Sequence, residues 1–571
     1  MTHTPPRILR ISLASKTSVL HDLQGSNILL GGRALTARIV RDEVPGPCDP
    51  LGRHNKIIFS GGPLAGTLVS SASRLSIGAK SPLTGTSKES NAGGVVAYKL
   101  GRLGLRAVIF EDRLPDEDGW TIVKIDAKGV SFESGADLAG LGAYEKARRL
   151  SGRYGKEAGF ALIGPAGEQR LVCAGVACTD MEGSPGRYSG RGGLGAVLAS
   201  KGILAVVVDD GEAPKEEFAD RAAFTGLQKQ LAELINTNPG TCEVMRLYGT
   251  ASMMDLTSSL GALPVRNFSR GVFESVDKIN ARTLHQTIEA RGGEGRVSHA
   301  CMRGCLVQCS NVYPDADGRT LVSPIEYENL ALLGSNCGIG DLDAIARLNY
   351  LCNDMGVDTI DIGAAIAVAM EAGLAPFGDV KFAKDAIAGI AQGAVLSRLI
   401  GSGAAITGKV LGAHRVPVVK GQSMAAYDPR AIKGIGVTYA TSPQGADHTA
   451  GNTARMPAKH HEKEGQADNS RAMQHFIALV DSLGICVMVS GAIKDMNMIL
   501  SLINARFGTS FTLDEAKTLA AATLAAEREF NAKAGITAAH DRLPEFFYEE
   551  MNPDSRSVFD LTDEELEKTH A

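Results

Sequence analysis

The chain has 571 residues, of which 44% are hydrophobic and 22% are charged, as expected for a globular protein with a full core. Its formal net charge of −5 provides no basic excess to attract nucleic acid or anionic lipid. The start, MTHTPPRILRISL, lacks the apolar stretch of a signal peptide, and Asp361 and Glu371 interrupt the apolar run from Ile360. We therefore expect a cytoplasmic protein without nucleic-acid or membrane partners, whose ten cysteines are thiols or metal ligands and not disulfides.

Residues 1–210 are predicted to form a strand-rich domain. Short apolar runs alternate there with glycine turns, as in RILRISL, KIIFSGG, RAVIFED, TIVKI, FALIGPAG and ILAVVVDD. No internal repeat is evident in the sequence. The loop GRGGLG at 190–195 imitates a dinucleotide-binding fingerprint, with Asp209 as its acidic partner. Because the preceding TDMEGSPGRYS does not read as a strand, NAD binding is not predicted.

The remaining sequence has helical periodicity and divides into two parts. Residues 211–412 contain FADRAAFTGLQKQLAELINT and DLDAIARLNYLCNDMG. A break rich in glycine and proline follows, and residues 413–571 contain RAMQHFIALVDSLG and a last long helix with Thr512 as its N-cap and Gly535 just past its end. The sequence thus predicts an α+β protein, with one β-rich domain followed by two mainly α-helical domains.

Three cysteines lie close together in HACMRGCLVQC at 299–309, namely Cys301, Cys305 and Cys309. On a straight helix the first and last would be about 12 Å apart, so the segment must turn, and Gly304 permits a turn. Zinc sites favour C-x2-C pairs, and a radical S-adenosylmethionine site has a shorter last gap. An iron–sulfur cluster accepts flexible spacing and a distant last ligand, whereas three simply buried cysteines are the plain alternative.

A fourth ligand is expected where the chain makes a sharp turn. Cys486 follows Gly484 at the end of a predicted helix, in DSLGICVMV at 481–489. Cys337, in GSNCGIG, is its nearest rival. The other cysteines lie in segments without such a turn and are interpreted as buried side chains: Cys48, Cys173, Cys178, Cys242 and Cys352.

The turn DSLGIC at 481–486 has a counterpart, NDMGVD, at 353–358. Each follows an apolar helix, and one such turn alone is an ordinary helix C-cap. Two of them predict related halves that hold one ligand from two sides, with side chains able to accept hydrogen bonds from ring N–H and amino groups, as on a pterin. The matching positions are Asn353, Gly356 and Asp358 in one turn, and Asp481, Gly484 and Cys486 in the other.

At this point the sequence resembles the tungsten- or molybdenum-dependent aldehyde ferredoxin oxidoreductases over nearly its whole length. Besides the cysteines and the paired turns, the resemblance rests on RILRISL, GGRALTARIV, FSGGPLAGT, SNAGG at 90–94, GRGGLGAVLASKGILAVVV at 190–208, PIEYENLALLGSN at 324–336, YDPRAIKGIGVTYATSPQGADH at 427–448, and DRLPEFF. It implies that the β-rich domain forms a cradle for two molybdopterins, which chelate one tungsten or molybdenum through their dithiolenes.

The resemblance also assigns residues. It implies that Cys301, Cys305, Cys309 and Cys486 ligate one [4Fe-4S] cluster and that the two turns hold the pterins. It further implies an active-site glutamate, best matched by Glu328 and, after a two-residue slip, by Glu326, together with the histidine His448. The residues expected at the pterin phosphates, with Mg²⁺ as an optional bridging ion, are Arg74, Asn91, Gly93, Arg191 and Gly192.

The activity implied is oxidation of aldehydes to carboxylic acids, or the reverse, with electrons passing through the cluster to ferredoxin or a small ferredoxin-like subunit; a homo-oligomer is compatible with it. Two alternatives stay open. One is reduction of an aromatic thioester, as in benzoyl-CoA reductases, and the other is a non-catalytic electron-transfer subunit.

Several departures from the family pattern bear on the site. The first gap of the triplet has three residues instead of two, Asn353 replaces an aspartate, and SPQGADH replaces a more basic pattern. RLNY at 347–350 cannot supply the Glu-x-x-His motif that bridges subunits through iron in some members.

Overall fold

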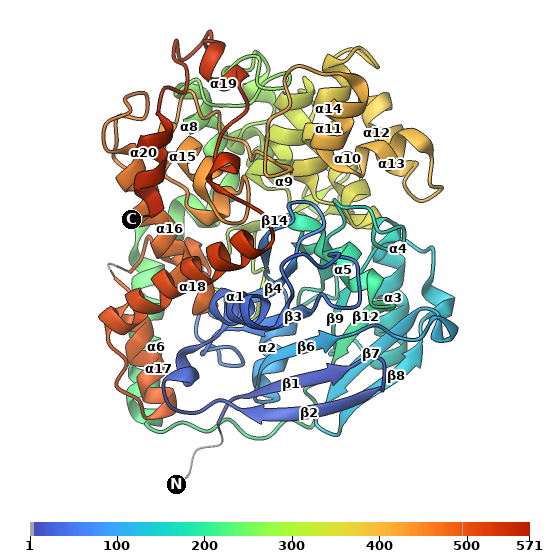
Figure 1. Ribbon diagram of the computed structural model, residues 1–571, viewed down its shortest axis with the longest axis vertical. Coiled ribbons are helices and arrows are strands. Elements are labelled where there is room, and N and C mark those ends of the chain that lie inside the picture. Colours follow the sequence, from blue (N-terminus) through green and yellow to red (C-terminus); the bar gives the residue numbers. More distant parts are fainter. Residues whose placement is uncertain (1–4, 494, 571) are drawn as a thin grey trace.

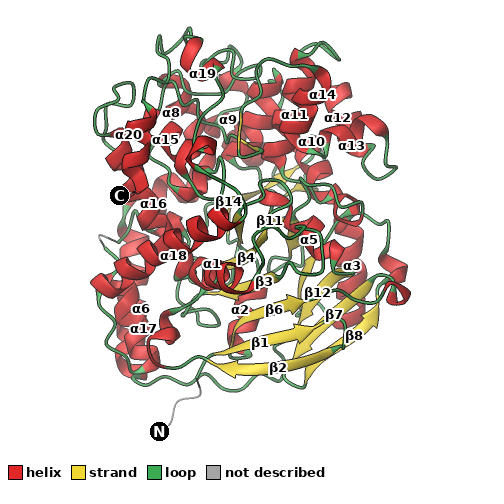
Figure 2. Ribbon diagram, viewed as in Figure 1, coloured by secondary structure: helices red, strands yellow, loops and turns green. Residues whose placement is uncertain are grey.

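The computed structural model describes residues 5–493 and 495–570. Two six-stranded sheets, both built before residue 210, occupy the lower part of the molecule in Figure 1, and helices cover the upper part and one flank (Figure 2). This arrangement confirms the predicted α+β fold with a β-rich N-terminal part.

Each of the first two sheets is mixed. The first has the order β2-β1-β6-β3-β4-β5 and the second the order β11-β10-β9-β12-β7-β8. The strands are β1 (Arg7–Ser12), β2 (Thr17–Asp22), β3 (Ile57–Gly61), β4 (Leu75–Lys80), β5 (Ser87–Ala92), β6 (Leu105–Glu111), β7 (Thr121–Asp126), β8 (Gly129–Ser134), β9 (Gly159–Leu162), β10 (Val176–Cys178), β11 (Arg187–Ser189) and β12 (Ile203–Val208).

The two sheets have the same topology, so the expectation of no internal repeat was wrong. Each strand of the first sheet corresponds to the strand numbered six higher in the second sheet, so that β1 corresponds to β7 and β6 to β12. Corresponding strands have the same neighbours, and corresponding pairs run in the same relative direction, including the parallel pairs β1–β6 and β7–β12. In each half a Gly-Gly pair, 93–94 or 192–193, leads into a short helix, α2 (Val96–Arg102) or α5 (Leu194–Ser200). The repeat is one of backbone path, and few side chains retain it.

The central strands are hydrophobic because both of their faces are covered. In β3, β9 and β12 every residue is buried, and one hydrophobic core joins the two sheets, for example through Phe59 and Phe160. Strands with both faces covered are expected to be continuous apolar runs, as IIFSG and ILAVVV largely are. The two halves therefore form one rigid base.

The loop GRGGLG needs a correction. A strand does precede it, since β11 (Arg187–Ser189) ends at the residue before Gly190. The strand escaped prediction because it is only three residues long. The nucleotide-binding interpretation still fails, because β11 and β12 are separated by β10 and β9, whereas a dinucleotide-binding unit joins neighbouring parallel strands.

The rest of the chain is mainly helical, with a three-stranded sheet and a two-stranded sheet: β13 (Arg296–His299), β14 (Ser310–Pro314), β15 (Thr320–Val322), β16 (Val418–Val419) and β17 (Gln422–Ser423). The helices are α1 (Gly32–Glu43), α3 (Ala143–Tyr154), α4 (Pro165–Glu168), α6 (Arg221–Thr237), α7 (Arg246–Tyr248), α8 (Met253–Ser259), α9 (Ala281–Arg291), α10 (Leu342–Met355), α11 (Thr359–Glu371), α12 (Val380–Ala388), α13 (Val395–Ile400), α14 (Gly403–Leu411), α15 (Lys433–Thr441), α16 (Gln466–Ser482), α17 (Asn497–Phe507), α18 (Leu513–Lys533), α19 (Phe546–Glu549) and α20 (Asp563–Glu567).

Two predicted helices deserve comment. The long helix α18 begins as expected at the N-cap Thr512, whose side chain forms a capping box with Glu515. The apolar run from Ile360 is α11, which is almost entirely buried in the helical core. Among the residues described, no helix is both long enough and apolar enough to cross a membrane.

Candidate functional site

The two matching turns end helices α10 and α16, and both press against the β-rich base. Gly356 and Gly484 adopt left-handed backbone conformations, with φ of +79° and +66°. A Cβ at Gly356 would lie 2.7 Å from the amide nitrogen of Gly164, and one at Gly484 would lie 2.5 Å from that of Gly62. Only glycine satisfies both the conformation and the close approach.

The turn at 353–358 is held by backbone hydrogen bonds to the second half of the base. The Gly175 N–H donates to the Gly356 carbonyl over 3.0 Å, and the Asp358 N–H donates to the Cys173 carbonyl over 3.0 Å. The side chain of Asp358 then accepts from the first N–H groups of α11. This turn is therefore both a helix end and a helix start.

The turn at 481–486 is held in the same way by the first half. The Arg74 N–H donates to the Gly484 carbonyl over 3.1 Å, and the Cys486 N–H donates to the Ser71 carbonyl over 2.7 Å. Arg74 and Gly175 each immediately precede the corresponding strands β4 and β10. The prediction of two halves that grip from two sides thus corresponds to a real duplication of the base.

The polar residue that opens each turn faces a residue near the start of a helix in the base. Arg33 lies 3.7 Å from Asp481 and makes two 2.8 Å bonds to Glu527. The Asn353 amide donates to the Tyr144 hydroxyl over 3.3 Å. Burial raises the pKa of Asp481 well above its usual value, although Arg33 opposes this. Its side chain still has 16% of its surface accessible, so it faces space that protein does not fill.

The four predicted cluster cysteines converge. Residues 301–309 form turns and not a helix, as the spacing required. A hydrogen bond from Cys305, aided by nearby arginines, lowers the pKa of Cys301 to about 6. Burial raises the pKa of Cys309, and the neighbouring Cys301 and Cys486 raise it further. Four thiols that interact in this manner form a donor set suited to an iron–sulfur cluster.

The rival Cys337 lies elsewhere. It is buried in the helical core, where its Sγ lies 3.3 Å from the Leu332 carbonyl and 3.4 Å from the Gly363 carbonyl. Cys486, in contrast, interacts with Cys301 and Arg74. The structure therefore groups Cys486, and not Cys337, with the triplet.

Arg74 connects the cysteines with the second turn. Its side chain donates to the side chain of Asn91 and, over 3.0 Å, to the Asn91 carbonyl. Burial opposes its charge, but Cys486, Cys301 and Asp481 together raise the pKa of this arginine. Gly93 lies beside Cys301, since a Cβ there would be 3.3 Å from its Sγ. These predicted cofactor residues thus lie at the junction of the thiols and the base.

Arg191 occupies a buried centre near the first turn. Its guanidinium lies 3.3 Å from Asp358, 3.8 Å from Asp361 and 3.7 Å from Asp447, and it donates to the Ala446 carbonyl over 2.8 Å. Burial raises the pKa of Asp358 to about 7, although Arg191 opposes this. The adjacent Gly192 has a φ of +83° and lies against the side chain of Lys88. Three acidic side chains therefore surround this one arginine.

Glu328 and His448 face each other, with 3.6 Å between Glu328 Oε1 and His448 Nε2. The other oxygen of Glu328 accepts from the Ala426 N–H over 2.9 Å. Burial raises the pKa of Glu328 to about 8 and lowers that of His448 to about 4. Near neutral pH the pair is therefore a protonated carboxyl beside a neutral imidazole, and a perturbed pair of this kind is typical of catalytic sites. The ring of Tyr427 lies 5.9 Å from that of His448.

Glu326, the alternative glutamate, points elsewhere. Its carboxylate accepts a hydrogen bond from the hydroxyl of Thr250. Burial raises its pKa to about 7, and its charge influences Cys309 rather than His448. The two glutamates flank Tyr327 and lie on opposite sides of it, one toward the thiols and one toward the histidine.

Sequence reasoning missed three residues of this region. Lys88 on β5 donates to Asp447 over 2.6 Å, and the pair is almost completely buried. Burial opposes the ionisation of Asp447, but Lys88 and Arg191 hold its pKa well below the usual range. Arg187, also buried, helps to lower the pKa of Cys301. Asp447 could have been found from its place beside His448, whereas Lys88 and Arg187 had no distinguishing signal.

Several buried polar atoms at this site lack a hydrogen-bond partner among the described residues. They include Glu328 Oε1, His448 Nδ1, Asp361 Oδ2, Gln422 Oε1, Ser423 Oγ, Ser189 Oγ, Ser73 Oγ and Glu89 Oε1. An unmatched buried polar atom costs about 1–3 kcal/mol, so such a concentration is expected where a polar ligand completes the hydrogen bonds. With two glycine-gripped turns and four thiols, the residues fit a bis-pterin metal group and an iron–sulfur cluster.

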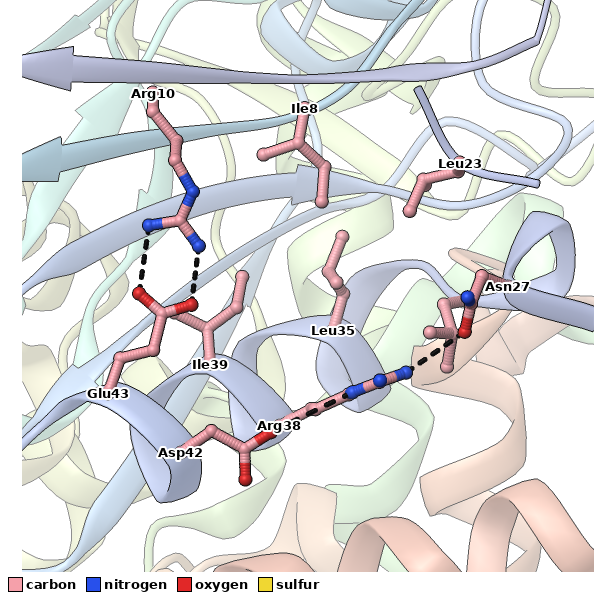
Figure 3. Close-up of a pocket in the computed structure, with 10 residues that line it drawn as sticks. Ile8, Arg10, Leu23, Asn27, Leu35, Arg38, Ile39, Asp42 and Glu43 are labelled. Carbon is pink, nitrogen blue, oxygen red and sulfur yellow. Dashed lines mark hydrogen bonds and ion pairs between the residues drawn. The ribbon is translucent and has the colours of Figure 1, made fainter. Parts of the chain in front are cut away.

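Two other features are not part of this site. A pocket of about 230 Å³ lies between β1 and α1 (Figure 3). Its polar side chains satisfy one another, with Glu43 bonded to Arg10, and Asn27 accepting from Arg38 over 3.0 Å. The charged side chains of the pocket are therefore paired, and the rest of its lining is largely apolar.

The second feature is a group formed by Asp180, Glu182 and His299, whose possible ligand atoms lie within 4.8 Å of one another. Arg187 can only donate, and it lies 3.0 Å from His299 Nδ1, so the ring proton must be on Nε2. That nitrogen then donates to Glu182 over 3.1 Å. The histidine has no free lone pair, and the group is a hydrogen-bond relay rather than a metal site.

Comparison with known families and sequences gives a consistent result. The family described as "Aldehyde ferredoxin oxidoreductase, N-terminal domain" matches residues 8–210, and "Aldehyde ferredoxin oxidoreductase, domains 2 & 3" matches residues 226–569. The chain is 29% identical to a tungsten-containing aldehyde ferredoxin oxidoreductase of Pyrococcus horikoshii and 28% identical to that of Pyrococcus furiosus. Each alignment covers 96% of this chain and 92% of the relative.

A more distant relative and a solved structure extend the comparison. An aliphatic sulfonate oxidoreductase, WOR-like subunit, of Pyrococcus furiosus is 26% identical over 75% of this chain and 72% of its own length. Among solved structures, the active-site complex BamBC of benzoyl coenzyme A reductase with 1,5-dienoyl-CoA superposes with a TM-score of 0.81 at 19% identity. It covers 100% of this chain and 94% of its own, and at this identity the similarity concerns the fold.

Proposed function

The chain belongs to the aldehyde ferredoxin oxidoreductase family, and from this premise we propose that it is a tungsten- or molybdenum-pterin enzyme that oxidises aldehydes to carboxylic acids. The reaction converts aldehyde and water into acid, two protons and two electrons. Ferredoxin or a ferredoxin-like subunit would accept the electrons. The observation that carries the proposal is the pair of glycine turns, each held by two backbone hydrogen bonds to its half of the base, one of them ending at the fourth clustered cysteine.

The geometry supports a specific assignment of residues to the cofactors. Asp481 and Asn353 would bind the pterin rings, and Arg74, Asn91, Gly93, Arg191 and Gly192 would contact the pterin side chains and phosphates, where a Mg²⁺ ion would also fit. Cys301, Cys305, Cys309 and Cys486 would ligate a [4Fe-4S] cluster. When bound, the metal group would take up the two electrons and the cluster would carry them away singly.

The protein groups would manage the protons. Neutral His448 can accept a proton from the water that supplies the acid oxygen, and protonated Glu328 can donate a hydrogen bond to the carbonyl oxygen of the aldehyde. The Ala426 N–H holds Glu328 in place, and Asp447, fixed by Lys88, lies 3.8 Å from His448 Nδ1, where its charge would stabilise a protonated imidazole. Lys88 and Asp447 are buried, and Glu328 and His448 are largely covered, which would limit the access of bulk water to the reacting groups.

An anaerobic assay tests the proposal. The purified protein is expected to reduce a viologen dye when an aldehyde is added, with one acid formed for every two dye molecules reduced. NAD and NADP should not accept electrons, because the glycine loop is not part of a dinucleotide-binding unit. Activity with an aromatic thioester and not with aldehydes would support the benzoyl-CoA reductase alternative. A redox-active cluster without either activity would support the electron-transfer alternative.

A further inference from the structure

The two candidate pterin positions differ in one matched pair of side chains. In the first half, Arg33 is the second residue of α1, and in the second half Tyr144 is the second residue of α3. Both helices start at a glycine N-cap and connect equivalent strands of the repeat. Each points its side chain at the first residue of the adjacent turn, Asp481 or Asn353. The charged pair Arg33–Asp481 thus corresponds to the neutral pair Tyr144–Asn353.

The surroundings preserve this difference. Arg33 is further paired with Glu527, and Asp481 also interacts with Arg74, so the first position is an ionic network. At the second position Tyr144 stacks on Tyr350 at 4.7 Å with 7° between the rings, and Tyr188 donates to the Asn353 carbonyl. The second position is therefore lined mainly by aromatic side chains, with Asp354 accepting from the Tyr144 N–H over 3.2 Å.

The two positions also offer different hydrogen-bonding groups. Asp481, which lies 3.7 Å from Arg33, presents its carboxyl oxygens as acceptors, so it matches two adjacent N–H donors on a ligand edge. The Asn353 amide gives one hydrogen to Tyr144, which leaves one N–H and one carbonyl oxygen for a ligand. It therefore matches an edge with one donor beside one acceptor.

We infer that the two pterins are bound through different edges, the first through its adjacent ring N–H and amino group, the second through a donor and a neighbouring ring acceptor. Tyr144 determines this choice by fixing the orientation of the Asn353 amide. This inference rests on the proposed bis-pterin function and goes beyond it, since the two turns would otherwise be equivalent.

The first test is Tyr144→Phe, which keeps the stacking on Tyr350 and removes only the hydroxyl. The variant should fold normally and keep its iron, because the cysteines are untouched. Its pterin content, measured by fluorescence after denaturation and oxidation, should fall at least two-fold after dialysis. An unchanged pterin content would overturn the inference.

The second test exchanges the charge. Asn353→Asp should also lose pterin at least two-fold, because it adds a buried carboxylate beside Asp354 that faces the Tyr144 hydroxyl and not an arginine. The double variant Tyr144→Arg with Asn353→Asp reproduces the pair of the first position and should recover most of the loss. A single variant that keeps two pterins, or a double variant no better than the single, would contradict the inference. If wild-type protein contains no pterin at all, the proposed function itself fails, which separates the two outcomes.

Discussion

The two halves of the β-rich base hold their turns with the same backbone bonds and yet present different chemistry. At the last position of the turn, one half has Cys486 and the other has Asp358. Cys486 joins the thiols of the triplet, whereas Asp358 caps α11 and pairs with Arg191. One half therefore lies beside the clustered thiols, and the other lies beside Arg191.

The comparison teaches that backbone and side chains carry separate information in this protein. The backbone grip fixes where a ligand sits, and it needs only glycines and free N–H groups, which tolerate wide sequence change. The side chains decide what each position does, and they have diverged between the halves. Changes to either level should therefore have separable effects.

The largest effect is expected from removing the side chain that distinguishes the first half. Cys486→Ser should lose most of the iron, from about four per chain to less than one, because the hydroxyl is a poor cluster ligand. The matched control Cys337→Ser should keep its iron, since that thiol lies in the helical core. Iron analysis after anaerobic purification decides, and retention of iron by Cys486→Ser with loss in the control would reverse the assignment.

The next largest effect is expected on turnover, from substituting Glu328 or His448 near the second half of the base. Glu328→Gln and His448→Asn should each lower kcat by about 10² to 10⁴, the usual contribution of an acid or base, while metal and pterin contents stay unchanged. Glu326→Gln is the matched control and should lose less than about ten-fold, because that side chain faces Thr250 and not the histidine. A larger loss in the control than in Glu328→Gln would transfer the role to Glu326.

The pH dependence sharpens the same point. Burial keeps Glu328 protonated up to a pKa of about 8 and His448 neutral down to a pKa of about 4. Activity needs the carboxyl as donor and the imidazole as base, so kcat/KM should fall as pH rises through about 8 and as pH falls through about 4. The pair can titrate as a coupled unit. In Glu328→Gln the residual activity should lose the alkaline limb, and an unchanged limb would assign it to another group.

The smallest effect tests the equivalence of the grip itself. Gly356→Ala and Gly484→Ala should each cost about 1 to 3 kcal/mol of stability, from the left-handed conformation and the contact with Gly164 or Gly62. Gly535→Ala has a similar φ of +89° but no atom within 4 Å of the added Cβ, and should cost about 1 kcal/mol. Thermal unfolding of the cofactor-free chains measures all three, and equal losses in all three would show that close approach is unimportant.

Much of this arrangement was predictable because the signals are local. The strands and helices follow from apolar periodicity, and the paired turns follow from a glycine at a fixed distance from a polar residue. The repeat of the two sheets was not predictable from the sequence. The two segments share a backbone path, but only a Gly-Gly pair and a few apolar strands remain similar in sequence.

The site residues that the sequence did not reveal were missed for one reason, which is that each contacts a residue far away along the chain. Lys88 and Asp447 are 359 positions apart, and Tyr144 and Asn353 are 209 apart. The local sequence around a lysine in a strand does not indicate which carboxylate it will pair with. Such pairs emerge only once the base and the helices are packed together.

The central claim is that the two halves hold two pterins around one metal beside one cluster. Elemental and pterin analysis of anaerobically purified protein tests it most directly, after growth with both tungsten and molybdenum supplied. We predict about four irons, one tungsten or molybdenum atom and two pterins per chain. Protein that contains the iron but neither heavy metal nor pterin would contradict the account.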